Sequence, residues 1–423
     1  MLYTLFEWLA KEGLQFPGSR LLQYITLRAM LATLLSLFLT LYVGKRIILF
    51  LAARQIGESV RELGLKGEEQ KRGTPTMGGV IILLGILIPT MLFADLTKVY
   101  VRLLVLSTLW LGVVGFIDDW LKLRAKRLSQ AAGKPYKKGE KDGLAAWSKI
   151  LGQVGLGLII GATLLFNDHV KVYREYEGVD QPAQAIRVPS AQGERVLVAA
   201  DEPVTTIPFV RGHEFNYSKL LPEGLRGYTW LLYLLVVIFI VTAVSNGSNI
   251  TDGVDGLATG ISAIIGVCLG VFAYASGNTR MAEYLNIMYI PNIGELSIFI
   301  AAMVGACIGF LWYNAYPAQV FMGDTGSLAL GGIIAALAII IRKELLIPIF
   351  CAVFLMENLS VIIQVSWFKY TRKHYGEGRR VFLMSPLHHH YQRLGYHESK
   401  IVVRFWIVTL MCVVFAIMSL KIR

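Results

Sequence analysis

Residues 231–256 read LLYLLVVIFIVTAVSNGSNITDGVDG, an apolar run that passes directly into a cluster of amides, carboxylates and glycines. Charge-poor runs of this kind recur along the 423 residues, of which 55% are hydrophobic and 17% are charged. Because about 20 apolar residues cross the hydrocarbon core of a bilayer, the pattern predicts an all-α polytopic membrane protein with about ten transmembrane helices. We expect these spans near residues 23–43, 78–94, 99–117, 148–166, 229–244, 257–275, 295–312, 327–341, 345–368 and 401–420.

The net charge of +12 is distributed unevenly along the chain. Lysine and arginine concentrate between the first and second, the third and fourth, and the ninth and tenth predicted spans. With ten spans these three segments share one side of the membrane. The positive-inside rule makes that side cytoplasmic and both termini periplasmic.

Residues 167–228, between the fourth and fifth predicted spans, contain more acidic than basic side chains. Short apolar alternations such as Arg195-Val196-Leu197-Val198 are typical of strands. We therefore expect a small β-rich external (periplasmic) insertion within a single integral-membrane domain of residues 1–423. Because the acidic clusters described next are predicted on the other side, we expect the insertion to be structurally independent. Replacing about residues 171–223 with a short Gly/Ser linker should then leave the chemistry intact.

Three acidic clusters stand at the ends of apolar runs on the predicted cytoplasmic side. They are Asp118-Asp119, the series from Asn246 to Asp255, and the segment around Asp324. Carboxylates are costly at a bilayer boundary unless they are paired, hydrated or bound to a cation. The three clusters together predict a shared Mg²⁺ site and phosphoryl chemistry at a membrane surface.

Asp118 and Asp119 are neighbours, and side chains of neighbouring helical residues point about 100° apart. We therefore expect different roles, one carboxylate facing the reacting phosphate and the other holding the metal or a lysine. Lys122 follows Asp118 by four residues. The alternative interpretation is a solvated helix end with an ordinary i,i+4 ion pair.

The second cluster repeats a polar side chain every three residues, in Asn246, Asn249, Asp252 and Asp255. This spacing drifts around an α-helix, so we expect the backbone to tighten or break there, with oxygen ligands for a cation or a nucleotide. The alternative is a polar turn between two spans.

Asp324 precedes an apolar helix that we expect to begin near Ser327. An aspartate at such a place is often only a helix cap. Thr325 and Ser327 can cap instead, which leaves Asp324 for a metal. Phe321 is a candidate for stacking on a base, with a membrane-facing aromatic as the alternative.

Three consecutive histidines, His388, His389 and His390, lack the i,i+4 spacing of a zinc site, so imidazoles beside phosphates or a sugar fit better than zinc. An exposed run with no role is the alternative. Among the basic residues, only those beside turns rich in glycine or proline stand out from simple attraction to lipid headgroups, which contributes about 1 kcal/mol per residue. These are Lys71, Lys122 and Lys134.

Five strings of the sequence resemble the phospho-N-acetylmuramoyl-pentapeptide-transferase family, peptidoglycan translocase I, within the polyprenyl-phosphate N-acetylhexosamine-1-phosphate transferase superfamily. They occur in the family's order and extend over nearly the whole chain. They are KRGTPTMGG at 71–79, FIDDW at 116–120, SNGSNITDGVDGLA at 245–258, YNAYPAQVFMGDTGSLALGG at 313–332 and SPLHHHYQ at 385–392.

The resemblance implies roles for individual residues. Asp324 resembles the Mg²⁺ ligand, and Asp118, with Asp119 beside it, resembles the base or nucleophile. Pocket residues around the uridine and diphosphate would include Asn249, Asp252, Asp255 and Asn314, with Asn246 beside them, and Phe321 would stack on uracil. Lys71, Lys122 and Lys134 would contact phosphate or nucleotide. His388 would join the aspartates as a catalytic residue, with His389 and His390 contacting the substrate.

The implied activity is that of a Mg²⁺-dependent phosphoglycosyl transferase of the bacterial inner membrane, a homodimer with a cytoplasmic site. It would combine UDP-N-acetylmuramoyl-pentapeptide with undecaprenyl phosphate to give lipid I and UMP, the first membrane step of peptidoglycan synthesis, with no nucleic-acid partner. One rival is the transfer of N-acetylglucosamine-1-phosphate to the same lipid. A rival of another class is a cation-coupled transporter, but transporter acids belong near the bilayer midplane and these lie at span ends.

Overall fold

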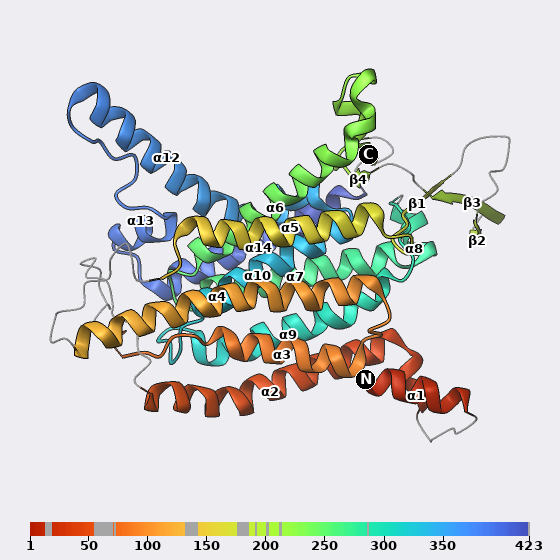
Figure 1. Ribbon diagram of the computed structural model, residues 1–423, viewed down its shortest axis with the longest axis horizontal. Helices are drawn as coiled ribbons and strands as arrows, with labels where there is room; N and C mark the ends of the chain where they lie inside the picture. The colour runs from red at the N-terminus through yellow and green to blue at the C-terminus, as the bar shows by residue number, and fades with distance from the viewer. Residues whose placement is uncertain are drawn as a thin grey trace.

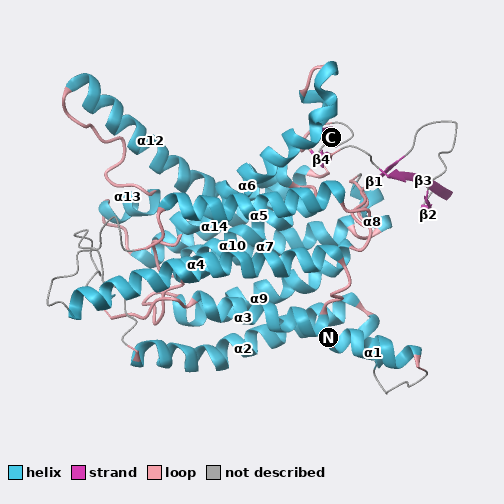
Figure 2. Cartoon of the chain, viewed as in Figure 1, coloured by secondary structure: helices cyan, strands magenta, loops and turns pink. Residues whose placement is uncertain are grey.

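The computed structural model describes residues 1–12, 19–54, 71, 73–131, 143–175, 186–190, 193–199, 203–210, 214–285 and 287–421. Lys134 lies outside these residues. Helices dominate the described chain, and strands occupy only residues 173–216 (Figures 1 and 2).

Within the described residues, nine helices are long and apolar enough to cross a membrane, and α3, with 15 residues, is shorter. This confirms the predicted helical, multi-pass membrane fold. The ten are α2 (Ile25–Ala53), α3 (Gly79–Phe93), α4 (Val99–Ala131), α5 (Ala146–Phe166), α6 (Thr229–Thr251), α7 (Leu257–Ser276), α9 (Leu296–Asn314), α10 (Gly323–Ile340), α12 (Ala352–Tyr375) and α14 (Glu398–Ser419).

Shorter helices connect or flank the long ones. The ninth predicted span is interrupted, because the 3₁₀ helix η6 (Glu344–Leu346) and a single turn, α11, precede α12. Pro348 lies in the first turn of α11, where its missing N–H is tolerated. The others are α1 (Leu2–Lys11), η1 (Ser19–Gln23), η3 (Tyr217–Leu220), η4 (Glu223–Tyr228), α8 (Thr279–Leu285), η5 (Ile293–Glu295), α11 (Ile347–Phe350) and α13 (Leu387–Arg393).

Helix α10 forms the centre of the bundle. It contacts α3, α4, α5, α6 and α7, and every residue from Thr325 to Ile340 is buried. A helix that is apolar on all sides is stable only when other helices surround it. The central position of α10 fixes the place of Asp324 in its first turn, so the acidic site is built on the most enclosed element of the fold.

Helix α2 shows how an outer helix divides between protein and lipid. Its inward face carries small residues four apart, Ala32, Ser36 and Thr40, which are buried. The Ser36 hydroxyl donates a hydrogen bond of 2.8 Å to the carbonyl of Ala302 in α9. Small residues let two helices approach closely where no hydrophobic effect drives them together, and the opposite face, with Leu34 and Phe38 exposed, suits lipid.

The two ends of the bundle differ. Both chain termini and the strands gather at one end, whereas α13 and the C-terminal ends of α2, α4 and α12 lie at the other (Figure 1). The acidic site belongs to this second end. The β-rich insertion is therefore remote from the site.

The insertion forms two small antiparallel sheets, which confirms its predicted β character. The first has the order β1 (Tyr173–Glu175), β3 (Gly193–Ala199), β2 (Ile186–Ser190), and the second pairs β4 (Val204–Thr206) with β5 (Glu214–Asn216).

The second sheet is part of the protein core, so the expectation that the whole insertion is structurally independent is wrong. The backbone N–H of Thr206 donates to the carbonyl of Arg342 at 3.0 Å, and its hydroxyl accepts from the Lys343 ammonium at 2.7 Å. The Tyr217 hydroxyl donates to Glu344 Oε1 at 3.1 Å. Deleting β4, β5 and the start of η3 would remove Thr206 and Tyr217 and leave a buried ammonium and a buried carboxylate without these partners, which is strongly destabilising.

Lys343 gives a testable dependence of stability on pH. Its side chain is fully buried, and burial lowers its pKa to about 7, against the opposing effect of Glu344. The unfolded chain, with the ordinary lysine pKa, binds more protons between pH 7 and 10, so stability rises with pH in that window by up to about 1.4 kcal/mol per unit. We expect the melting temperature of detergent-solubilised protein to rise from pH 7 to 9, and to rise less in Lys343→Met. A rise unchanged from wild type would contradict this; Lys219→Met, at an exposed position, is the control.

Candidate active site

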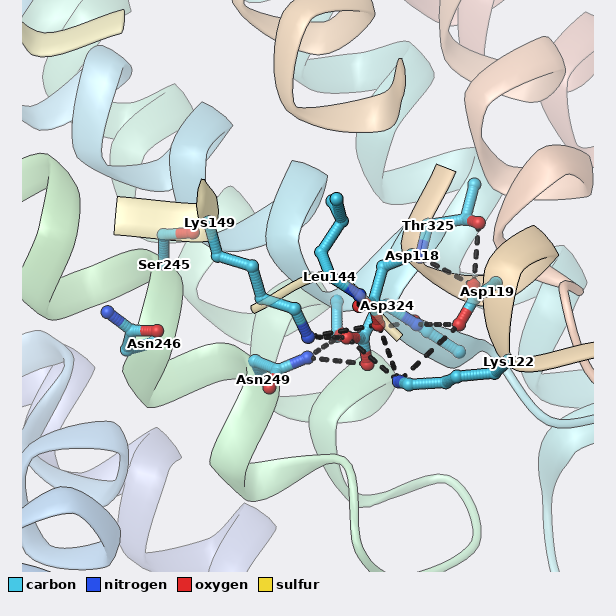
Figure 3. A network of polar contacts seen from close by, with 12 residues as sticks. Asp118, Asp119, Lys122, Leu144, Lys149, Ser245, Asn246, Asn249, Asp324 and Thr325 are labelled. Atoms are coloured by element: carbon cyan, nitrogen blue, oxygen red, sulfur yellow. Dashed lines mark hydrogen bonds and ion pairs between the residues drawn. The ribbon is translucent and has the colours of Figure 1, made fainter. Parts of the chain in front are cut away.

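Asp118 and Asp119 of α4 meet Asp324 of α10, and the three offer carboxylate oxygens that lie within 4.8 Å of one another (Figure 3). Close contact between the two helices makes this possible. A Cβ atom on Gly115 would lie 2.2 Å from the carbonyl oxygen of Asp324, so only glycine permits the observed separation. The predicted convergence of these clusters is thus present in the structure.

Asp119 caps helix α10 from another helix. Its carboxylate accepts hydrogen bonds from the backbone N–H groups of Asp324 (3.1 Å) and Thr325 (2.9 Å) and from the Thr325 hydroxyl (2.7 Å). Helix α10 begins at Gly323, not near Ser327, and Asp119 supplies the cap that we expected from Thr325 and Ser327. An anion at a helix N-terminus is favourable because the first N–H groups lack partners within the helix.

Asp118 points toward two lysines. Its Oδ2 lies 2.6 Å from the Lys122 ammonium and 2.9 Å from the Lys149 ammonium, while Oδ1 accepts a 2.7 Å hydrogen bond from the backbone N–H of Leu144. The i,i+4 ion pair with Lys122 is therefore present, but as part of a larger network. Asp118 and Asp119 have different partners, as their helical geometry predicts.

Asp324 completes this network. Its Oδ2 lies 3.1 Å from the Lys122 ammonium and also contacts Lys149, while Oδ1 accepts from the Asn249 side-chain amide at 3.0 Å. The Asp324 side chain is only 15% exposed. The two ammonium groups thus bridge two carboxylates that would otherwise repel each other.

Lys149 is the main residue that sequence reasoning missed. It is the only charged side chain in α5, and it lies in the first turn of that helix. A lone cation at the end of an apolar span reads as a topology signal, which is how we interpreted the basic residues in general. Lys149 stands at the end of a predicted span, on the side of the membrane where we predicted the three acidic clusters. That shared side is the signal that would have identified it.

The polar series of the second cluster divides between several partners. Asn246 exchanges two side-chain hydrogen bonds with Gln153 of α5, at 3.1 and 3.2 Å, whereas Asn249 reaches Asp324. Helix α6 ends at Thr251 and α7 begins at Leu257, so Asp252 and Asp255 lie in the turn between them. The backbone breaks where the three-residue spacing predicts.

Asp255 belongs to a second ionic cluster. Its Oδ1 lies 2.7 Å from the Lys71 ammonium, which also lies 2.6 Å from Glu398 Oε1. Glu398, which we did not predict, also accepts from the backbone N–H of Asp255 at 2.8 Å. Burial opposes the charge of Lys71, but the two carboxylates outweigh it and raise its pKa above the usual value. Lys71 therefore remains charged, 6.0 Å from the ring centroid of half-buried Phe321.

Asn314, the last residue of α9, ties the turn between α6 and α7 to the end of α9. Its side-chain oxygen accepts from the backbone N–H of Gly256 at 3.2 Å and from the Thr259 hydroxyl at 3.1 Å, and its amide donates to the carbonyl of Val320 at 2.9 Å. Asn314 is almost fully buried. These bonds hold the end of α9 against the turn between α6 and α7.

The three histidines occupy different environments on α13. His388 is fully buried beside Glu357 of α12, with 3.2 Å between Nδ1 and Oε2. His389 and His390 are half-buried; the ring of His389 contacts Gln392 at 2.7 Å, and His390 Nδ1 accepts from the backbone N–H of Leu383.

Comparison with known proteins agrees with this architecture. Residues 197–342 match the model of Glycosyl transferase family 4, and residues 71–83 match Phospho-N-acetylmuramoyl-pentapeptide-transferase signature 1. The chain is 54% identical to the phospho-N-acetylmuramoyl-pentapeptide-transferase of Flavobacterium psychrophilum, 50% to that of Porphyromonas gingivalis and 49% to that of Parabacteroides distasonis, each time over all of both chains. The chain belongs to the phospho-N-acetylmuramoyl-pentapeptide-transferase family.

Proposed function

We propose that this chain transfers phospho-N-acetylmuramoyl-pentapeptide from its UDP-linked donor to undecaprenyl phosphate, giving lipid I and UMP. The observation that carries the proposal is full-length similarity to transferases of that name, in a chain whose carboxylates and lysines meet at one end of a membrane bundle. In the reaction an oxygen of the lipid phosphate forms a bond to the β-phosphorus, and the bond from that phosphorus to UMP breaks.

The acidic cluster fits a divalent cation such as Mg²⁺. Asp118, Asp119 and Asp324 provide three carboxylates against the two ammonium groups of Lys122 and Lys149, which leaves one negative charge uncompensated. Hard oxygen ligands suit Mg²⁺, and Asp324 with Asp118 would hold it, since the oxygens of Asp119 cap α10. When bound there, Mg²⁺ would neutralise the diphosphate and the charge that develops on leaving UMP.

The lysines restrain Asp118 until substrate arrives. Both of its oxygens already have partners, so the carboxylate is a poor base or nucleophile in this arrangement. A diphosphate forms charge-assisted hydrogen bonds with ammonium groups and therefore competes with Asp118 for the two lysines. We infer that the donor draws Lys122 and Lys149 toward its phosphates and thereby frees Asp118, which then takes the proton of the lipid phosphate or attacks the β-phosphorus itself.

The Lys71 cluster lies in the same half of the molecule and supplies the remaining part of the pocket. We infer that Lys71 and Asp255 hold the nucleotide next to the ring of Phe321, since a charged pair beside an aromatic face suits a base with polar edges. Asn249, Asp252 and Asn314 shape the wall of this pocket.

Orientation and assembly complete the proposal. The C-terminal ends of α4 and α12, which carry many of the basic residues that the structure describes, lie at the acidic end of the bundle (Figure 1). The positive-inside rule assigns that end to the cytoplasm and the termini to the periplasm of the bacterial inner membrane. The resemblance to the family supports a homodimer. Cysteine accessibility in intact and lysed cells tests the first inference, and cross-linking in native membranes tests the second.

The test of function is an assay of purified protein with Mg²⁺, undecaprenyl phosphate and radiolabelled nucleotide sugars. We expect transfer from UDP-N-acetylmuramoyl-pentapeptide, with equimolar UMP release, and none from UDP-N-acetylglucosamine. Efficient transfer from UDP-N-acetylglucosamine would move the protein to the rival branch of the superfamily. Absence of transfer from either donor would overturn the proposal.

Lys149→Met is expected to lower turnover by about a hundredfold, the usual effect of removing one phosphate-stabilising donor. Its ammonium contacts both Asp118 and Asp324, so the substitution also leaves these carboxylates less compensated. UMP release measures the effect. Lys219→Met, at an exposed position on the insertion side, should retain full activity. Normal turnover of Lys149→Met would exclude Lys149 from the chemistry.

A further inference from the structure

Glu357 is a buried carboxylate that the transfer reaction described above does not use. It lies in α12 and, like His388, is completely buried. The backbone N–H of His388 donates to Oε1 at 3.2 Å, and Nδ1 of the same residue lies 3.2 Å from Oε2, within ion-pair distance but without a hydrogen bond. One oxygen of the carboxylate therefore anchors the backbone of His388, while the other lies beside its ring.

The other edge of the His388 ring faces the turn between α6 and α7. A Cβ atom on Gly253 would lie 2.3 Å from His388 Nε2 and 2.9 Å from Cε1. Real Cβ contacts are never this close, so the imidazole occupies the space that any other residue at position 253 would need. The ring thus acts as a spacer between Glu357 and the backbone of the turn.

This turn carries a residue of the proposed donor pocket. Two positions after Gly253, Asp255 holds the Lys71 ammonium and accepts a 3.0 Å hydrogen bond from the backbone N–H of Ala318. A series of contacts therefore runs from Glu357 through His388 and Gly253 to Asp255. A small displacement of a positioned group is costly for binding and turnover, because such groups act only within narrow geometric limits.

We propose that Glu357 is a positioning residue that holds the His388 ring against Gly253 and thereby places Asp255 for donor binding. His388 then acts through the turn, in place of the direct catalytic contact predicted from the sequence. The readout of donor affinity rests on the proposed transferase function; the contacts among the three residues do not.

The first test separates KM from kcat. Glu357→Gln and Gly253→Ala are each expected to raise the KM for the UDP-linked donor about tenfold, the effect of losing one well-placed interaction, with kcat within about threefold of wild type. Glu223→Gln and Gly224→Ala are matched controls, because Glu223 is exposed and a Cβ on Gly224 meets nothing within 4 Å; both should resemble wild type. A fall of about a hundredfold in kcat for His388→Ala, with unchanged KM, would overturn the proposal in favour of direct catalysis.

The second test is a pair of double-mutant cycles. Once His388 is alanine, Glu357→Gln and Gly253→Ala should each add little to the increase in KM, because the ring that transmits their effects is gone. Effects that multiply independently would overturn the proposal. The same cycles measured by the melting temperature, and by its shift on addition of UMP, do not depend on turnover. If the wild type transfers neither sugar, the proposed function fails, but the melting cycles still test the contacts. Non-additive changes in melting temperature would support the contacts among Glu357, His388 and Gly253, and additive changes would refute them.

Discussion

Asp324→Asn is expected to lower the transfer rate by at least about a thousandfold while the protein stays folded. Among the residues that the structure describes, Asp324 is the one carboxylate that contacts Lys122, Lys149 and Asn249 together. Asparagine has nearly the same shape and keeps an oxygen for the amide of Asn249, so the packing of α10 is unaffected. The substitution removes the negative charge that balances the two ammonium groups and that a divalent cation requires.

Two measurements test this expectation. UMP release at increasing Mg²⁺ gives the loss of turnover, and Mn²⁺ binding followed by electron paramagnetic resonance reports the cation site without any turnover. We expect weaker Mn²⁺ binding in the variant and a melting temperature close to wild type. The control Asp168→Asn, at an exposed position on the insertion side, should leave both unchanged. Near-normal activity at low Mg²⁺ would remove Asp324 from the cation site.

The fold was predictable because lipid imposes a simple rule on sequence. Runs of about 20 apolar residues must be helices in a bilayer, so hydropathy alone located each long helix. It did not locate their ends: α4 continues to Ala131 and α12 to Tyr375, because helices extend beyond the membrane when polar residues with adequate helix propensity follow. The break before α12 also escaped prediction: residues 345–356 carry no charge and look like one apolar span, and Pro348 was not taken as a sign of an interruption.

The site was predictable as a set of residue types and less so as a set of contacts. Because carboxylates are costly at a membrane boundary, the charges of Asp118, Asp119 and Asp324 were enough to predict that they share one site. Asp119 caps α10 because α4 packs against α10, and the two bonded residues are 205 positions apart in the sequence. No local sequence pattern encodes this contact. Lys149 was missed for the same reason, and the role of Lys134, outside the described residues, stays a prediction.

The insertion shows the limit of reasoning from loop composition. Its charge balance and alternating residues correctly indicated strands. They carried no information about Lys343 and Glu344, which lie more than a hundred residues further along the chain and need Thr206 and Tyr217 as partners. A buried polar pair between a loop and the core can be predicted only when both segments of the sequence are considered together.

Asp118→Asn should be the most damaging single change, with turnover lowered by about ten-thousandfold, because a general base contributes up to that factor and a nucleophile contributes more. Asparagine can neither accept a proton from the lipid phosphate nor attack phosphorus. It still accepts a hydrogen bond from the backbone N–H of Leu144, so the local structure should persist. Turnover within about tenfold of wild type would exclude both roles for Asp118.

The same residue separates the two possible routes of transfer. In the two-step route Asp118 attacks the β-phosphorus and UMP leaves; an oxygen of the lipid phosphate then attacks the phosphorus of this aspartyl-phosphate and releases the Asp118 carboxylate. Wild-type enzyme given radiolabelled donor without lipid would then exchange UMP and retain protein-bound phosphosugar, and Asp118→Asn would do neither. In the one-step route UMP leaves only when undecaprenyl phosphate is present. The crowded surroundings of Asp118 favour the one-step route, because its oxygens contact Lys122, Lys149 and a backbone N–H. Accepting a proton requires only one lone pair to be freed from these contacts. Bonding to phosphorus would require the carboxylate to leave more of them. We therefore expect no UMP exchange without lipid, and labelled protein would refute this expectation.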